Sequence, residues 1–402
     1  MEQLPRFSNS VRLTAPQFAQ LAAGHSAVDG IATLQAAQLS RAMLLVKWLA
    51  GGDPTLARAA MSLAGAQRTC RSAVNAVLAH PWLSVWAVQR LRGGATDRPD
   101  YLPYAALAAT LATGGVARVP AGHLGVVPVP GAGVWRTGRR PRSRFDRSGP
   151  DWLPLRRAEA TQQSLNLRLA VDDIDPYRDC YGRRTSPRLT EAAFASWSAN
   201  LAEAWRLLTT FAPGYAVELA AGLRIFVPLA DYGDGQHSVT HTDGFGAFAA
   251  SLELTPADLA VTMVHEFQHS KLSGLLTLVR LFDDTDPMRY FAPWRAGPRP
   301  ISGLLQGVYA FTAVGEVWAS LREHPTLADG ATRQVALVRL QVDRGIGELR
   351  RALSLTPAGH QWVDLLTERS TRLMALELPP DVHEEASRAL AVSERAWLAG
   401  RR

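Results

Sequence analysis

The sequence predicts a mainly α-helical protein with a small β-sheet, an α+β fold. Three observations support this: an Ala- and Leu-rich N-terminal part with helical periodicity, a middle part with short β-branched or alternating segments, and a C-terminal part of amphipathic helices. A chain of 402 residues also exceeds the usual size of one hydrophobic core. We therefore expect a helical region over residues 1–115, an α+β region over 116–230 and a third region over 231–402.

The composition is that of an ordinary globular protein, with 47% hydrophobic and 20% charged residues. The net charge of +7 favours acidic partners, such as an acidic peptide or a small dicarboxylate, and no nucleic-acid module is recognised. No apolar run is long enough for a membrane span, and no secretory signal is visible. Cys70 and Cys180 are the only cysteines, which argues against a disulfide framework or a thiolate zinc site. We expect a cytoplasmic protein without nucleic-acid or membrane partners.

The predicted elements follow from periodicity and from Gly and Pro punctuation. In the N-terminal region, helices are expected at 34–48, 55–66, 69–79, 82–93 and 103–113, and no polar constellation there suggests chemistry. In the middle region, short strands are expected at 126–135, 164–170 and 222–228, with a strong helix at 190–211. The arginine run between Arg136 and Arg147 is expected to be a solvated loop. The alternative is a basic surface that binds an acidic peptide.

The strongest chemical signal is the motif His265-Glu266-Phe267-Gln268-His269. On a helix, histidines four residues apart project from one face and can hold one metal ion, and Glu266 can reach the metal or a bound water. The preceding segment supports a helix, because Thr255 suits the N-cap, Pro256 suits the first turn and Asp258 complements the helix dipole. We therefore expect residues 231–402 to be a metal-binding catalytic region of metallopeptidase-like layout.

The segments on either side of this helix add candidates. A strand is expected within 245–254, beside the metal helix, where an extended peptide could dock by β-pairing. His237 and His241 precede it in what is expected to be a loop. After the motif, helices are expected at 303–319, 331–355, 361–376 and from 383 onward.

A third metal ligand is expected from the helix at 303–319. Glu316 is a carboxylate in an otherwise apolar helix, and a buried carboxylate must be paired or bind a metal. Gln306 and Tyr309 are rivals for this position. Two histidines and a carboxylate suit zinc, with Glu266 activating water for peptide hydrolysis. They equally suit Fe(II) with an α-keto acid and O₂, where Arg295 or Arg299 could bind the distal carboxylate. Spacing alone does not choose between these alternatives.

The run His-Glu-Phe-Gln-His-Ser-Lys-Leu, with Phe245-Gly-Ala before it, resembles the α-ketoglutarate-dependent His-Glu-x-x-His-type peptide β-hydroxylases of ribosomally synthesised, post-translationally modified peptides. The segment Ala-Pro-Trp-Arg-x-x-Pro-Arg-Pro, the later Gly-x-x-x-Gly-Val-Tyr-Ala, and Asp175-Pro-Tyr-Arg178 are similar too, so the resemblance is densest over 160–325. It implies Fe(II), α-ketoglutarate and O₂, a precursor peptide as substrate, and His265 and His269 as iron ligands. It assigns Glu266 no step in activating oxygen. A zinc metallopeptidase that processes a precursor peptide remains the alternative.

Overall fold

The computed structural model describes residues 11–25, 27–93, 98–115, 122, 125–136, 149–231, 233 and 235–399. Its N-terminal part is helical: α1 (Ala15–Ala23), α2 (Val28–Gly52), α3 (Pro54–Thr69), α4 (Arg71–Leu78), α5 (Pro81–Leu91) and α6 (Leu102–Ala112). Two further helices, α7 (Glu191–Phe211) and α8 (Pro213–Gly222), precede the helices of the C-terminal part: α9 (Pro256–Leu276), α10 (Ile301–Leu321), α11 (Ala328–Arg350), α12 (Pro357–Met374) and α13 (Pro380–Ala399). The described part is thus mainly helical with small sheets, as the sequence predicts.

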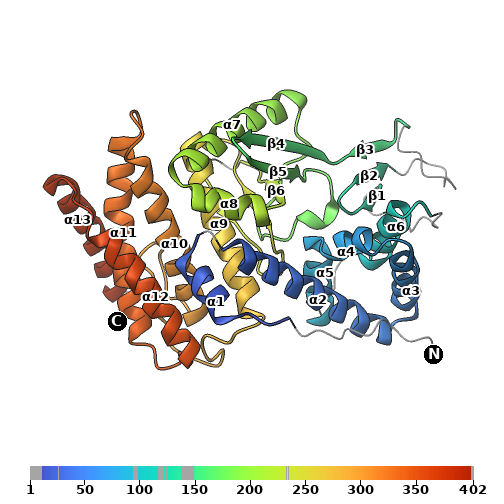
Figure 1. Cartoon of the computed structure of the whole chain (residues 1–402), viewed down its shortest axis with the longest axis horizontal. Helices are drawn as coiled ribbons and strands as arrows, with labels where there is room; N and C mark the ends of the chain where they lie inside the picture. The colour runs from blue at the N-terminus through green and yellow to red at the C-terminus, as the bar shows by residue number, and fades with distance from the viewer. Residues whose placement is uncertain are drawn as a thin grey trace.

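Two sheets lie between these helical parts. A small antiparallel sheet contains β1 (Val126–Val129), β2 (Gly133–Arg136) and β3 (Trp152–Pro154). The larger sheet has the order β4-β5-β6-β8-β7, formed by β4 (Arg156–Gln162), β5 (Leu165–Val171), β6 (Ile225–Pro228), β8 (Ala247–Ala250) and β7 (Ser238–Val239). β5, β6 and β8 run parallel, whereas β4 and β7 are antiparallel to their neighbours. Figure 1 shows helices α2–α6 on one side of the molecule and α10–α13 on the other.

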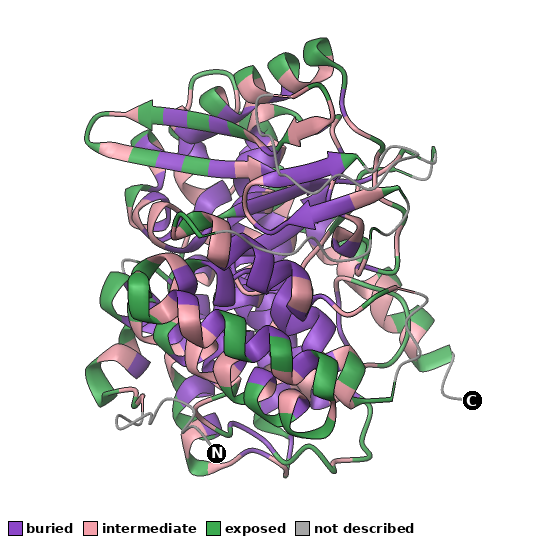
Figure 2. Ribbon diagram, turned by 90° about the vertical axis from the view of Figure 1, so that its right-hand side faces the viewer, coloured by how far each residue is buried: buried purple, intermediate pink, exposed green. Residues whose placement is uncertain are grey.

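The central strands are buried on both faces. In β6, Phe226 packs into the core formed with α7, α9 and α10, while Ile225 and Val227 face the core formed with the N-terminal helices. Such strands are near-continuous apolar runs, which is why β6 and β8 carry no polar alternation. Figure 2 shows these strands and the helices beneath them as the buried centre of the molecule. Helix α9 packs directly against β8 and β7.

Three buried donors from the C-terminal part bind the carbonyls at the end of α1. Tyr309 donates its hydroxyl to Leu21 O, Arg369 donates to Ala22 O at 3.1 Å, and Lys271 donates to Gly24 O at 3.0 Å. The last carbonyls of a helix lack partners within it, and cations near that end complement the helix dipole. The N-terminal helices are therefore joined to the region that carries the motif.

The structure contains elements that the sequence did not predict. The sequence analysis did not expect helices α1 and α8 or strand β4. In β4 the buried residues are Ala158 and Ala160, and two small side chains give too weak an apolar alternation to predict a strand. The arginine run falls almost wholly outside the described residues, apart from Arg136 at the exposed end of β2. Within the described residues, no helix combines the length and apolarity needed to cross a membrane.

Candidate metal centre

Helix α9 begins where the sequence predicts. Thr255 is its N-cap, and the hydroxyl of Thr255 accepts a hydrogen bond from the backbone N–H of Asp258 at 3.1 Å. Pro256 occupies the first turn, where its missing N–H costs nothing. The helix runs on to Leu276 and is buried over most of its length, with the two motif histidines only half-buried. It is a rigid, packed element from which both histidines project one turn apart.

The two histidines form a close pair. The Nε2 atoms of His265 and His269 are 3.1 Å apart, and the ring planes meet at 87°. Two imidazole nitrogens bound to one ion at about 2.1 Å each lie about 3.0–3.4 Å apart. The donor atoms therefore already have the spacing that a shared metal ion requires, and the residues fit such an ion.

A glutamine on α10 fixes the orientation of His269. Gln306 Oε1 lies 2.9 Å from His269 Nδ1, and Gln306 Nε2 donates to Ser273 Oγ at 3.1 Å. With the amide nitrogen bound to Ser273, Oε1 accepts the Nδ1 proton of His269 and leaves Nε2 with a free lone pair. Partners behind a ligating histidine set its tautomer in this way. Gln306, a rival for the third ligand, thus lies behind His269.

His265 lies in an apolar setting that keeps its ring neutral. Burial, and then the neighbouring His269, place the pKa of His265 well below its usual value. Phe311 of α10 packs edge-on against the His265 ring, with 5.0 Å between centroids. A neutral imidazole is the form that binds metal, so burial favours the ligand state over the protonated state.

Glu266 is buried and held by two hydroxyl groups. Its side chain is 2% exposed, and Oε1 and Oε2 accept hydrogen bonds of 2.6 Å from Ser238 Oγ and Thr240 Oγ1. Oε1 lies 4.0 Å from His265 Nε2. The carboxylate is therefore fixed beside the histidine pair and joined to the β7 segment. Ser238 and Thr240 were not predicted as partners of Glu266, because these bonds depend on how the β7 segment lies against α9.

The structure does not bring Glu316 to the histidines. Its carboxylate accepts hydrogen bonds from Arg369 at 2.8 and 2.9 Å and one from the Tyr215 hydroxyl. Burial acts to raise the pKa of Glu316, but the Arg369 charge outweighs it and holds the pKa below its usual value. Glu316 lies ten residues beyond Gln306 on α10, about 15 Å along the helix axis. In the described ranges, no three His, Cys, Asp or Glu side chains gather closely enough to hold a metal.

The expected set of His265, His269 and Glu316 therefore needs correction. A carboxylate in an apolar helix must be paired or bind a metal, and here an arginine of α12 satisfies the first requirement. Tyr309, the other rival, is buried and bonds to Leu21 O. His241 accepts a hydrogen bond from the Asp243 backbone N–H at 3.1 Å in the loop before β8.

The connection between α9 and α10 carries the two arginines singled out above. Trp294 of this connection stacks on Phe311, with ring centroids 5.0 Å apart, and Phe311 packs on His265. Arg299 is half-buried and Arg295 exposed, and burial and then the Arg295 charge lower the pKa of Arg299. Neither guanidinium forms an ion pair within the described residues. Two neighbouring cations without a counter-ion are suited to bind an anion.

The strand that could pair with a peptide is not the one expected. β8, within the expected segment 245–254, lies between β6 and β7 and is hydrogen-bonded on both sides. The edge of the sheet beside α9 is instead β7, at Ser238–Val239. A two-residue strand gives no alternation that could be recognised in the sequence.

Comparison with known proteins adds no relative: no family model matches the sequence, and no curated protein matches it.

Proposed function

We propose that the protein is an Fe(II)- and α-ketoglutarate-dependent oxygenase that hydroxylates side-chain β-carbons of a ribosomally synthesised precursor peptide. The observation that carries this proposal is the pair of His265 and His269 Nε2 atoms 3.1 Å apart, joined through Phe311 and Trp294 to a connection in which Arg295 and Arg299 form no ion pair within the described residues. Catalytic zinc sites use three protein ligands and a water. Fe(II) sites that use an α-keto acid likewise have three protein ligands. They differ in needing a fixed cation for the distal carboxylate of the α-keto acid, which Arg299 or Arg295 can supply and which a zinc hydrolase does not need.

Each residue of the centre then has a role. His265 and His269 hold the iron through Nε2, and Gln306 keeps the proton of His269 on Nδ1. Bound iron, with α-ketoglutarate and O₂, supplies the oxidising power that replaces a C–H bond by a C–OH bond. Glu266, fixed by two hydroxyls, places a negative charge beside the ion and offsets part of its charge.

Arg299 is the better of the two arginines for the distal carboxylate of α-ketoglutarate. It is half-buried, without an acidic partner among the described residues, and its connection is joined to His265 through Trp294 and Phe311. A guanidinium binds a carboxylate through two parallel hydrogen bonds, and these strengthen where water is partly excluded. Arg295, being exposed, is left for another partner.

The edge of β7 is the place for the peptide. An extended peptide can add to an exposed strand edge through main-chain hydrogen bonds. β7 lies against α9, and the Ser238 hydroxyl contacts Glu266 at 2.6 Å. A peptide paired there runs past the histidine pair, which brings its side chains to the metal.

The test uses anaerobically purified protein with Fe(II), α-ketoglutarate and the peptide encoded beside its gene, followed by labelled O₂. We expect the peptide to gain one labelled oxygen while succinate forms, and His265→Ala and His269→Ala to do neither. Peptide cleavage without O₂ would reject this proposal and establish the alternative, a zinc metallopeptidase. Wild-type protein that binds iron but forms no succinate would reject it as well.

A further inference from the structure

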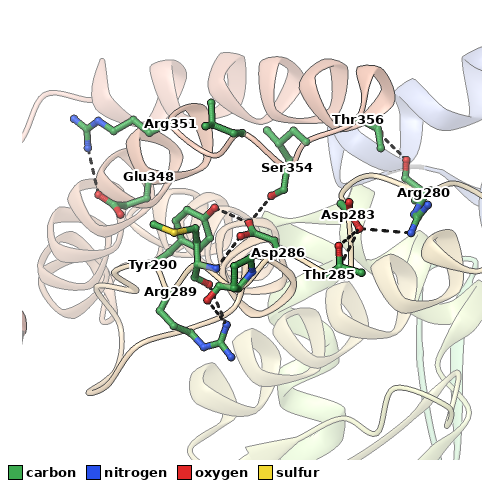
Figure 3. A pocket seen from close by; sticks show the side chains of 14 residues that line it. Arg280, Asp283, Thr285, Asp286, Arg289, Tyr290, Glu348, Arg351, Ser354 and Thr356 are labelled. Atoms are coloured by element: carbon green, nitrogen blue, oxygen red, sulfur yellow. Dashed lines mark hydrogen bonds and ion pairs between the residues drawn. The ribbon is translucent and has the colours of Figure 1, made fainter.

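Two hollows lie side by side along the connection between α9 and α10. The first, of about 770 Å³, lies between this connection and the link from α11 to α12 (Figure 3). The second, of about 540 Å³, lies between the same connection and α13. Both are lined by Pro287, Met288 and Arg289, so the two hollows meet at this segment. We call them together the connection groove.

The acidic side chains of the groove are already engaged. Figure 3 shows Asp286 between its partners, with the hydroxyls of Tyr290 and Ser354 donating to it at 2.7 and 2.5 Å. Glu348 accepts from Arg344 at 2.6 Å and from Arg351 at 3.2 Å. Glu348 is thus neutralised by arginines, whereas Asp286 keeps its charge, because hydrogen bonds from Ser354, Tyr290 and Met288 lower its pKa.

Two other arginines of the groove form no ion pair within the described residues. Arg289 is exposed and, among the described residues, donates to the backbone carbonyls of Pro287 and Met288, both at 3.1 Å, while its charge acts on the Asp286 carboxylate. Arg295 is exposed and forms no ion pair within the described residues. The second hollow, lined by Arg289 and Arg295 and by no acidic side chain among the described residues, therefore presents net positive charge.

The groove also presents apolar surface. Leu353 is fully exposed and Met288 is 54% exposed, both at the first hollow. The second hollow is walled by Phe291 and Trp397, whose rings pack 5.7 Å apart. Covering exposed Leu and Met side chains removes apolar surface from water and so favours binding. Exposed apolar residues beside unpaired arginines match a ligand that has both apolar and acidic side chains.

We propose that the connection groove binds an acidic peptide segment with apolar side chains. This inference rests on the proposed function: the segment is the part of the peptide substrate that is recognised but not modified. Continuity supports the assignment, because Trp294 of the same connection stacks on Phe311, which packs on His265. The element that forms the groove therefore also contacts the surroundings of the histidine pair, and a peptide held at both places has two attachment points that reinforce each other.

The test measures fluorescence anisotropy of three labelled peptides on the full chain, without metal or cosubstrate. One peptide alternates Leu and Glu, one alternates Ser and Glu, and one alternates Leu and Lys. We expect the Leu/Glu peptide to bind at least tenfold more tightly than the other two. We expect Arg289→Glu/Arg295→Glu to weaken it tenfold or more, and Leu353→Ser several-fold.

Matched controls separate the groove from general charge. Arg58→Glu/Arg68→Glu changes the net charge equally on exposed positions of α3, and Leu44→Ser removes an exposed apolar side chain from α2. Equal weakening by these controls, or equal binding of all three peptides, would overturn the proposal. Self-association that Leu353→Ser abolishes, without peptide binding, would assign the groove to a second copy instead. Since no turnover is measured, failure here is distinguishable from failure of the proposed function.

Discussion

Lys271 and Glu218 form an ion pair of 2.6 Å in which each side chain is only 1% exposed. Lys271 lies two residues beyond His269 on α9, and Glu218 lies on α8. Each partner also bonds the turn after α1, since Lys271 donates to Gly24 O and Glu218 accepts from Ala27 N, both at 3.0 Å. The pair therefore fixes α9 to α8 and to the N-terminal helices.

The first prediction concerns this pair. Lys271→Met should lower the free energy of unfolding by about 3–5 kcal/mol, because it leaves Glu218 charged and buried. Lys271→Met/Glu218→Leu should recover much of that loss, since no uncompensated charge remains. Urea unfolding monitored by circular dichroism measures both. A double variant as unstable as Lys271→Met would show that packing, not charge, causes the loss.

The second prediction separates Glu316 from the metal ligands. Glu316→Gln should lower the free energy of unfolding by about 3 kcal/mol, because Arg369 loses its counter-ion, while bound iron per chain stays unchanged. His269→Ala should do the reverse and lose the metal with little loss of stability. The measurement is the metal content of Glu316→Gln and of His269→Ala at a temperature where both variants are folded. Loss of metal from folded Glu316→Gln would make Glu316 a ligand after all.

The third prediction concerns the residue behind His269. Gln306→Ala should weaken metal affinity 10–100-fold, because His269 loses the partner that fixes its tautomer and ring orientation. Ser273→Ala should weaken it less, since it removes only the partner of Gln306. Competition against a chelator measures both affinities. Gln35→Ala, on α2, is the control and should leave affinity unchanged.

Sequence patterns predicted the helices best, and they predicted α9 because its cap, first-turn proline and apolar face all agree. They failed where a partner comes from far along the chain. Arg369 lies 53 residues beyond Glu316, and nothing in the local pattern shows that a helix so distant neutralises it. The same holds for Ser238 and Thr240, whose bonds to Glu266 depend on how β7 lies against α9. The histidine pair was predictable because both histidines lie on one helix, one turn apart.

The fourth prediction is a pH dependence of stability. Burial, and then the charge of Asp172, raise the pKa of Asp175 to about 7 from an ordinary 3.8. Between these values the folded chain holds a proton that the unfolded chain releases, so stability falls as pH rises from about 4 to 7. Asp175→Asn removes this contribution. Its stability relative to wild type should therefore rise through that window and level off above pH 7.

Another titratable group near Asp175, His80, also contributes to the pH dependence of stability. The Tyr101 hydroxyl lies 3.2 Å from both Asp175 Oδ2 and His80 Nδ1. Burial lowers the pKa of His80 to about 3, so its contribution has the opposite sign and is lost as pH falls below its ordinary 6.5. The free energies of unfolding of wild type and of Asp175→Asn both contain the His80 contribution, so it cancels when one is subtracted from the other at each pH. A difference independent of pH, as expected for the exposed control Asp329→Asn, would contradict the prediction.

The fifth prediction tests the link from the α9–α10 connection to the metal centre. A Cβ at Gly307 would lie 2.1 Å from Trp294 Cζ2, so Gly307→Ala must displace the Trp294 ring from Phe311. Because Arg299 belongs to the same connection, KM for α-ketoglutarate should rise about tenfold or more, with a smaller change in kcat. Tryptophan fluorescence should shift even without cosubstrate. Gly330→Ala is the control, since its Cβ meets nothing within 4 Å and helix propensity alone favours it by about 1 kcal/mol. Unchanged fluorescence and unchanged KM in Gly307→Ala would show that the connection does not position the cosubstrate.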